Sequence, residues 1–305
     1  MHKYIHHPNE KVLSSNELSK KLYSQLDEFS AITKPEDYEI KLQEIYQLLE
    51  TIDGEPDPSL NVMVGGYVKE FVTTFLVLFY GTKDIQVSLE AHALIKSLTK
   101  YIVLLDKHYD EKNYEYKARA DIIFKKVMSE VDGYLKHAII HGMSTLWATA
   151  TYEINLRGRM LHGEIFNKKE IRNHIFLKSS DTELYGIILD NAIESFNPNI
   201  LQLIHYNQAI LDIQDDLTDI DEDILRHDLN VFVMSAASEV SLEDMYNSNA
   251  SSTDVVRIAS SQVLGIIDDF EACTVGIHVP DEYYFLKKFS SIYIKTLRKS
   301  IKNYQ

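Results

Sequence analysis

The sequence predicts an all-α protein, a helical bundle built around one apolar core. Apolar residues recur at steps of three and four along nearly the whole chain, which is the spacing of one face of an α-helix. Glycine and proline are scarce, with 11 and 6 residues among 305, and no alternating run of β-branched residues indicates a strand. Since 45% of the residues are hydrophobic, the chain can bury a full core.

Helices are expected in order wherever this spacing holds. Residues 53–59 are typical of a loop, and Asn197 before Pro198 is a good helix start. The predicted helices cover residues 15–30, 36–52, 59–80, 84–110, 115–141, 143–157, 168–177, 181–196, 198–224, 228–246, 252–273 and 281–302. Because no linker, repeat or shift in charge interrupts this series, residues 15–305 are predicted to form one domain after a mobile tail at 1–14.

Bulk properties exclude several classes of function. The net charge of −15 argues against a nucleic-acid partner, which needs a basic surface. The single cysteine, Cys273, excludes an intramolecular disulfide and suits a reducing compartment. The N-terminus lacks the apolar core of a signal peptide, and the most apolar segment, residues 71–81, is too short for a bilayer. We therefore expect a cytoplasmic protein without a transmembrane segment.

The most acidic segment, residues 210–223 ("ILDIQDDLTDIDED"), carries seven carboxylates in a half-apolar helical pattern. Positions four apart lie nearly above one another on a helix, so Asp215, Asp219 and Asp223 form one stripe with Asp212 and Asp216 at its edges. A solvated acidic face is the simpler interpretation. The apolar frame favours a partly buried stripe, which needs a cation. Mg²⁺ accepts carboxylate oxygens and commonly keeps water and substrate phosphates as its other ligands.

A second acidic pair lies upstream in residues 99–112. Asp106 and Asp110 are four apart and follow an apolar run. Alone, such a pair is common on protein surfaces. Together with the first cluster it predicts two acidic helix ends that face each other and hold a Mg²⁺–diphosphate from both sides.

These segments resemble the trans-isoprenyl diphosphate synthase and class I terpene synthase superfamily over most of the chain. Its two aspartate-rich motifs match "DKHYD" (106–110) and "DDLTD" (215–219). The segment "GGYVKEF" (65–71) lies where prenyl synthases carry Gly-Gly-Lys-Arg-x-Arg, and "LKSSDTELYG" (177–186) lies where they carry Lys-Thr-x-x-Leu-Phe. The resemblance implies a bundle of the isoprenoid synthase type around a central apolar cavity.

Departures from the prenyl synthase pattern favour the terpene synthase branch. Tyr67 and Val68 replace basic residues, and no Arg pair follows Asp110, so the site for a second anionic substrate is missing. Asp215, Asp219 and Asp223 fall on the ligand positions of the terpene synthase metal triad, with Asp in place of its usual Ser/Thr and Glu. The segment "RHDLN" (226–230) resembles the Arg-Gly-Asp-x-x-Asn segment of bacterial cyclases, whereas their C-terminal Arg-Tyr pair is absent.

The resemblance implies Mg²⁺, or Mn²⁺, as the cofactor, with three ions in the site. Asp106, Asp110, Asp215 and Asp219 are the expected catalytic residues. The expected metal ligands are Asp106, Asp110, Asp215, Asp216, Asp219 and Asp223. The basic residues expected to bind the diphosphate are Lys178, Arg172, Lys169 and Arg226.

The implied substrate is geranyl, farnesyl or geranylgeranyl diphosphate. Loss of its diphosphate leaves an allylic cation, which aromatic faces stabilise. Each aromatic residue taken alone is more often a core residue than a cavity wall. The candidates for the cavity wall are Tyr101, Phe75, Trp147 and Tyr152.

Two other functions stay open at this point. The first is an isoprenyl diphosphate synthase or prenyltransferase that joins an allylic diphosphate to an acceptor, with the homodimer that is usual for prenyl synthases. The second is a non-catalytic partner with the same fold, which Lys107 inside the first motif favours.

Overall fold

The computed structural model describes residues 17, 20–25, 28, 35–53, 67–247 and 251–304. Helices and their connections make up this part of the chain, and it contains no β-strand. The predicted all-α class is therefore confirmed. The chain divides into two compact units, residues 1–121 and 122–305. The predicted tail at 1–14 lies outside the described residues.

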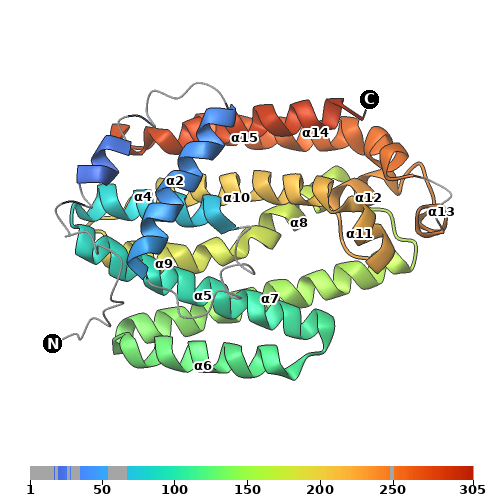
Figure 1. Ribbon diagram of the computed structural model, residues 1–305. Coiled ribbons are helices and arrows are strands. Elements are labelled where there is room, and N and C mark those ends of the chain that lie inside the picture. The colour runs from blue at the N-terminus through green and yellow to red at the C-terminus, as the bar shows by residue number, and fades with distance from the viewer. Residues whose placement is uncertain are drawn as a thin grey trace. The chain divides into compact units, whose positions relative to one another are not determined.

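The first unit is built on three helices that pack in sequence order. Helix α2 packs against α4, and α4 packs against α5 (Figure 1). The segment Phe71–Phe79 is buried along its whole length, so the most apolar part of the sequence forms core. Asp84 starts the following helix, because its side chain accepts hydrogen bonds from the backbone N–H groups of Gln86 and Val87. The helices are α2 (Pro35–Asp53), α4 (Val68–Thr82), α5 (Ile85–Glu111) and the beginning of α6 (Tyr114–Glu130).

The second unit is organised around α10, which contacts α8, α9, α14 and α15 and lies between the last two and the first two in Figure 1. Thirteen of its 21 residues are buried, as expected for a central helix. The helices of this unit are α7 (Gly133–Leu161), α8 (Lys168–Lys178), α9 (Thr182–Ala192), α10 (Pro198–Thr218), α11 (Ile220–Arg226), α12 (Val231–Ala236), α13 (Leu242–Tyr246), α14 (Ser252–Gly276) and α15 (Tyr284–Lys302), with 3-10 turns η2 (Ser179–Asp181) and η3 (Asp281–Tyr283).

The predicted helix boundary at residue 142 is wrong. Helix α7 runs through Gly142, and the break lies ten residues earlier, where Asp132 caps the helix by accepting from the backbone N–H of Leu135. Gly142, inside the helix, allows close packing, since a Cβ at this position would lie 2.7 Å from the side chain of Leu184 and 2.8 Å from that of Ile187.

The predicted helix 198–224 is also wrong at its C-terminal end, because α10 stops at Thr218. The side chain of Asn230 donates to the carbonyl oxygen of Asp216 at 2.6 Å. In a continuous helix that carbonyl would accept from the backbone N–H of Ile220. The long-range hydrogen bond therefore takes the acceptor that the next turn would need.

The predicted helix 228–246 divides into α12 and α13. Asn230 caps α12, and Ser241 caps α13 by accepting from the backbone N–H of Asp244. The pattern Ser-x-x-Asp at 241–244 is a known signal for the start of a helix. This break between two helices is therefore visible in the sequence.

One glycine of α9 and one of α7 test the close packing of the helices. A Cβ at Gly186 would lie 2.4 Å from Cδ2 and 3.2 Å from Cγ of Leu201, whereas a Cβ at Gly158 meets nothing within 4 Å. We expect Gly186→Ala to lower the free energy of unfolding by about 1–3 kcal/mol. Gly158→Ala should raise it by about 0.5–1 kcal/mol through helix propensity. Urea denaturation measures both, and equal effects would contradict the packing.

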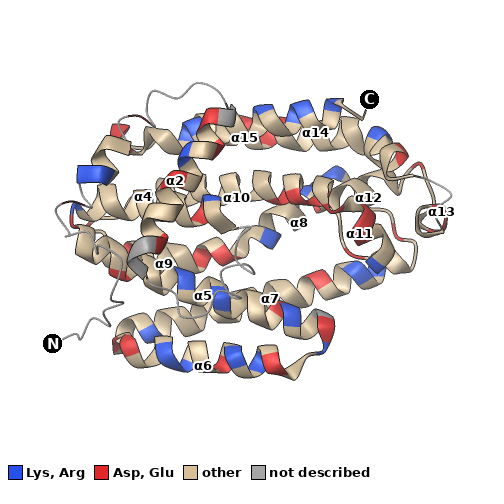
Figure 2. Cartoon of the chain, viewed as in Figure 1, with Lys and Arg blue, Asp and Glu red and all other residues tan. Residues whose placement is uncertain are grey.

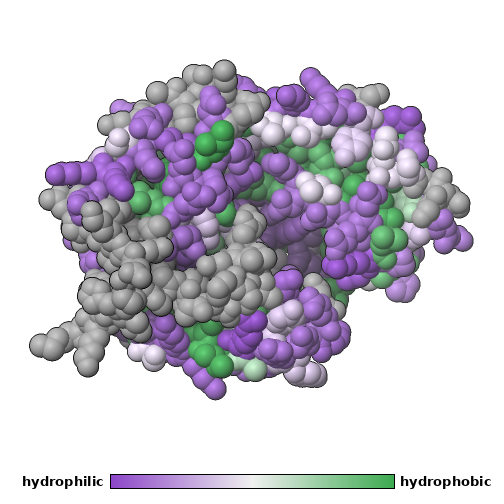
Figure 3. Space-filling view, viewed as in Figure 1, coloured by the Kyte–Doolittle hydropathy of each residue, from purple (hydrophilic) through white to green (hydrophobic). Residues whose placement is uncertain are grey.

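None of the described helices combines the length and the apolar content needed to cross a membrane. On the face drawn in Figure 3, hydrophilic residues make up most of the described surface and hydrophobic residues appear in smaller patches.

Candidate functional site

Acidic residues concentrate at the C-terminal end of α10 and on α11 (Figure 2). Asp215 and Asp216 lie in the last turn of α10, Asp219 joins the two helices, and Asp223 lies on α11. We call these four residues together with Asp212, one turn earlier on α10, the acidic cluster.

Asp216 is the best-anchored member of the acidic cluster. Its side chain is only 4% exposed. One carboxylate oxygen accepts from the ammonium group of Lys178 at 2.8 Å, and the other accepts from the backbone N–H of Val231 at 2.7 Å. The carboxylate thus joins α10 to the C-terminus of α8 and to the N-terminus of α12, where the helix dipole also favours a negative charge.

Asp212 is buried and has neutral hydrogen-bond donors. It accepts from the hydroxyl of Ser179 at 2.5 Å and from the side-chain amide of Gln208 at 3.1 Å. Burial raises the pKa of Asp212 to about 6, against the opposing effect of Lys178. The group therefore gains a full negative charge only near neutral pH.

Asn230 connects three helices behind the acidic cluster. It is fully buried, and its amide nitrogen donates to the carbonyl of Asp216 and, at 2.8 Å, to the carboxylate of Asp223. Its amide oxygen accepts from the backbone N–H groups of Phe232 and Val233 at the start of α12. Every polar atom of this side chain is used, so the positions of both acidic residues depend on it.

Arg157 of α7 holds the loop that carries Asn230. Its guanidinium donates to the backbone carbonyls of Arg226 at 2.6 Å and His227 at 2.8 Å, and it pairs with the carboxylate of Asp228 at 2.8 Å. These bonds satisfy carbonyls at the C-terminal end of α11, where a cation is favourable.

Asp215 and Asp219 differ from the other members of the acidic cluster. Both are exposed, and within the described part of the chain neither carboxylate has a hydrogen-bond or ion-pair partner. Desolvation by the surrounding protein, followed by repulsion from Asp212, raises the pKa of Asp215 to about 6. Burial likewise raises the pKa of Asp223 to about 6, although Asn230 opposes this. The negative charges of the cluster are therefore costly in the absence of a cation.

Lys178 supplies a cation that bonds directly to the acidic cluster. Burial works against its charge, but Asp216 and Asp212 outweigh this effect and raise the pKa of Lys178. Its side chain is still 37% exposed, and an ammonium group has three N–H donors. Lys178 can therefore hold Asp216 and also bind an anion.

The residues present fit a hard divalent cation by their chemistry. Asp215 and Asp219 supply carboxylate oxygens that no described residue binds, and such oxygens are the preferred protein ligands of Mg²⁺. Among the residues that the structure describes, no three His, Cys, Asp or Glu side chains are gathered closely enough to hold a metal ion by themselves. Water or substrate oxygens would have to complete the coordination.

For the other predicted residues of the second unit, the structure shows other contacts or exposure to solvent. Arg226 pairs with Glu222 at 2.6 Å, and Arg172 lies over the ring of Phe270 at 5.9 Å. Lys169 is exposed. The structure thus brings only Lys178, of the four predicted basic residues, into direct contact with the cluster. Of the predicted aromatic residues, Trp147 is 43% exposed and Tyr152 is half-buried.

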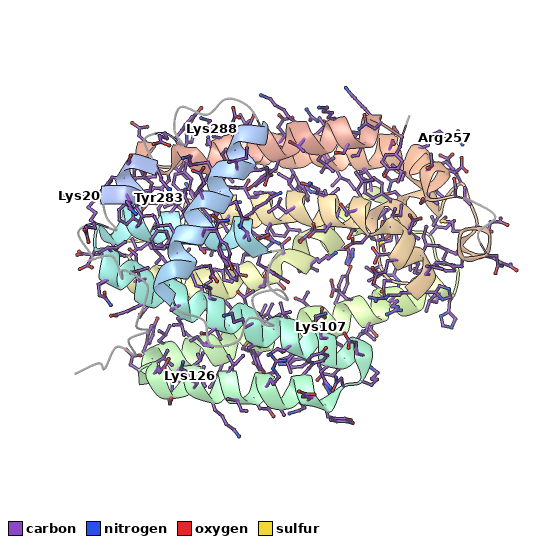
Figure 4. The ribbon with its side chains drawn as sticks, viewed as in Figure 1. Lys20, Lys107, Lys126, Arg257, Tyr283 and Lys288 are labelled. Carbon is purple, nitrogen blue, oxygen red and sulfur yellow. The ribbon has the colours of Figure 1, made fainter. Side chains whose placement is uncertain are left out.

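The first motif belongs to the first unit. Asp106 is exposed near the C-terminus of α5, and the side chain of Asp110 lies outside the described residues. Lys107, the second residue of the motif, lies on the same helix (Figure 4) and is 3.8 Å from the carboxylate of Glu111. Phe75 and Tyr101 are buried. That the two motifs face each other stays a prediction.

No family model, curated protein or solved structure matches the chain. The residues and their geometry therefore carry the functional interpretation.

The sequence did not point to two residues that shape the acidic cluster. In the sequence Asn230 stands out only as the end of the segment 226–230, although an Asn directly before an apolar run is a good helix cap. Ser179 gave no signal, because its partner lies 33 positions further along the chain.

The raised pKa of Asp212 makes unfolding depend on pH. Between its unfolded value of about 3.9 and its folded value of about 6, the native state binds more protons than the unfolded state, so this group's stabilising contribution falls as pH rises. Asp212→Asn lacks this contribution. We expect the unfolding free energy of the wild type to fall, relative to the variant, by on the order of 1–3 kcal/mol from pH 4 to pH 7.

Urea denaturation at a series of pH values measures this difference. His174, whose pKa is lowered to about 4 mainly by burial, contributes with the opposite sign, but it is present in both proteins and cancels. Asp221→Asn, an exposed change in the same acidic segment, should leave the pH dependence as it is. If the unfolding free energies of the wild type and of Asp212→Asn changed with pH in parallel, the raised pKa assigned to Asp212 would be contradicted.

Proposed function

We propose that the chain is a Mg²⁺-dependent class I terpene synthase, which ionises an allylic prenyl diphosphate and lets the carbocation cyclise or lose a proton. The observation that carries this proposal is the division of the acidic cluster. Asp212 and Asp216 are fixed by protein donors, whereas the carboxylates of Asp215 and Asp219, at the same helix end, have no partner among the residues that the structure describes.

The available carboxylates are the proposed metal ligands. Asp215 and Asp219 would hold Mg²⁺, with Asp223 beside them kept in place by Asn230. Bound Mg²⁺ neutralises the charge that grows on the leaving diphosphate. Because the pKa of Asp215 is raised in the free protein, a cation relieves an unfavourable charge, which supports metal binding at neutral pH.

Lys178 is the proposed diphosphate-binding residue of this unit. Its hydrogen bond to Asp216 fixes the ammonium at the edge of the acidic cluster, and its other N–H donors can meet phosphate oxygens. In this role Asp216 orients the ammonium group of Lys178, which binds the substrate. Asp216 would contact metal only if Lys178 moved away.

The remaining elements of the proposal come from the resemblance. Asp106 and Asp110 would hold metal from the other side of the diphosphate, and buried Phe75 and Tyr101 would stabilise the carbocation through their aromatic faces. A substrate of 10, 15 or 20 carbons would be consistent with these assignments.

Incubation of the full-length protein with geranyl, farnesyl and geranylgeranyl diphosphates and Mg²⁺ tests the proposal. We expect release of inorganic diphosphate together with a volatile hydrocarbon or alcohol, and no release when EDTA removes the metal. A longer prenyl diphosphate formed only when isopentenyl diphosphate is added would identify a prenyltransferase instead. No diphosphate release from any substrate would favour a non-catalytic partner.

A further inference from the structure

One buried side chain beside the acidic cluster lacks a hydrogen-bond partner within the described part of the chain. His174 of α8 is 2% exposed, and neither ring nitrogen bonds to an atom of the described residues. Buried polar groups nearly always have a partner, and leaving one unpaired is destabilising. Two orphaned nitrogens on one ring therefore indicate a ligand or a water molecule.

A partly exposed carboxylate lies close to His174. An oxygen of Glu153, on α7, lies 3.8 Å from its Nδ1 atom, which is too long for a hydrogen bond. The carboxylate of Glu153 is about one third exposed. Lys178 lies four residues after His174, on the same face of α8. All three side chains thus belong to one region, at the edge of the acidic cluster.

His174 is a neutral group in this position. Burial is the main cause that lowers its pKa to about 4, and Lys178 adds to the effect while Asp216 opposes it. A neutral imidazole offers one N–H donor and one acceptor nitrogen. A water molecule can donate to the acceptor nitrogen when this is Nδ1, and it then also suits the gap between Nδ1 and Glu153.

We infer that His174 and Glu153 hold a water molecule at the edge of the acidic cluster, and that this water adds to the carbocation, so that the product is a terpene alcohol. The inference rests on the proposed function and names its product class. His174 is then the residue that positions the nucleophile and accepts its proton.

The step balances in atoms and charge. The carbon–oxygen bond to the diphosphate breaks, and its electron pair stays on the diphosphate. A lone pair of the water oxygen forms a new bond to the cationic carbon, and one water proton moves to the free ring nitrogen of His174. That nitrogen is Nδ1, which faces Glu153, and it can pass the proton to the Glu153 carboxylate and on to solvent. The sum is prenyl diphosphate plus water giving alcohol, diphosphate and one proton.

Isotope labelling tests the source of the oxygen. Turnover in water enriched in ¹⁸O should give an alcohol that carries ¹⁸O, because the water attacks carbon. An unlabelled alcohol would mean attack at phosphorus and would overturn the inference. Diphosphate release with hydrocarbon as the only product would also overturn it, while leaving the proposed function intact. No diphosphate release would contradict both.

Two variants test the residue itself. His174→Leu removes both polar atoms, and we expect the ratio of alcohol to hydrocarbon to fall by about tenfold or more, equivalent to about 1.4 kcal/mol between the two product-forming barriers. His174→Gln keeps a donor and an acceptor and should retain more alcohol than His174→Leu. A ratio unchanged in both variants would overturn the inference.

His205 provides the matched control. Its two ring nitrogens are already bonded, to Thr182 at 3.0 Å and to the carbonyl of Phe176 at 2.6 Å. We expect His205→Gln to lower Tm without changing the ratio of alcohol to hydrocarbon. If His205→Gln shifts the ratio of alcohol to hydrocarbon as much as His174→Leu does, the ratio follows stability alone. That result would also overturn the inference.

Discussion

Replacing Asp215 and Asp219 together by asparagine is expected to lower diphosphate release by about 1,000-fold, which corresponds to about 4 kcal/mol of lost transition-state stabilisation. These are the two members of the acidic cluster whose carboxylates no described protein group uses. The substitution keeps the shape of each side chain and removes the charge that would bind the metal. Coupled detection of released diphosphate, with farnesyl diphosphate and Mg²⁺, measures the effect.

The same double variant should fold at least as well as the wild type. Asp215 carries a raised pKa, so removing its charge relieves repulsion at neutral pH. Asp221→Asn is the matched control, since it removes one charge from an exposed position in the same segment and should leave turnover unchanged. Equal losses in the control and the double variant would point to a general effect of charge. Full turnover in the double variant would mean that the metal site is elsewhere.

Asn230→Ala is expected to lower the free energy of unfolding by about 2–4 kcal/mol. The variant loses the cap of α12 and leaves the carbonyl of Asp216 without its donor in a buried place. It also frees the carboxylate of Asp223, so diphosphate release should fall as well. Urea denaturation gives the first quantity, and the diphosphate assay at a temperature where the variant is folded gives the second.

Asn167→Ala is the control for this prediction. Asn167 caps α8 in the same way, by accepting from the backbone N–H groups of Lys169 and Glu170, but it is exposed. We expect Asn167→Ala to lower the free energy of unfolding by about 1 kcal/mol and to leave turnover unchanged. If Asn230→Ala lowers the free energy of unfolding by no more than Asn167→Ala does, the hydrogen bonds of Asn230 behind the acidic cluster add nothing beyond a helix cap.

Periodicity and capping chemistry predicted most of the fold, because both are local. The spacing of apolar residues gave the helical class, and Asn197 with Pro198 gave the start of α10. The wrong boundaries have non-local causes. Gly142 is a packing residue whose neighbours, Leu184 and Ile187, lie more than 40 positions away, and α10 ends where Asn230 takes a carbonyl 14 positions earlier in the chain.

Only part of the candidate site could be predicted, again because the sequence shows local spacing and not non-local contacts. A stripe of aspartates four apart is visible in the sequence, whereas the use of each carboxylate is not. Only the fold shows that Lys178 holds Asp216, while the carboxylate of Asp215 has no partner among the described residues. His174 gave no signal at all, since its orphaned nitrogens depend on the packing around α8.

The central claim is that Asp215 and Asp219 bind divalent metal together with diphosphate. A titration with Mn²⁺ in the presence of inorganic diphosphate, followed by the electron paramagnetic resonance signal of free Mn²⁺, tests it most directly. We predict that the wild type binds more Mn²⁺ than the Asp215→Asn/Asp219→Asn variant and that Asp221→Asn binds as the wild type does. Equal binding by the wild type and the double variant would contradict the account.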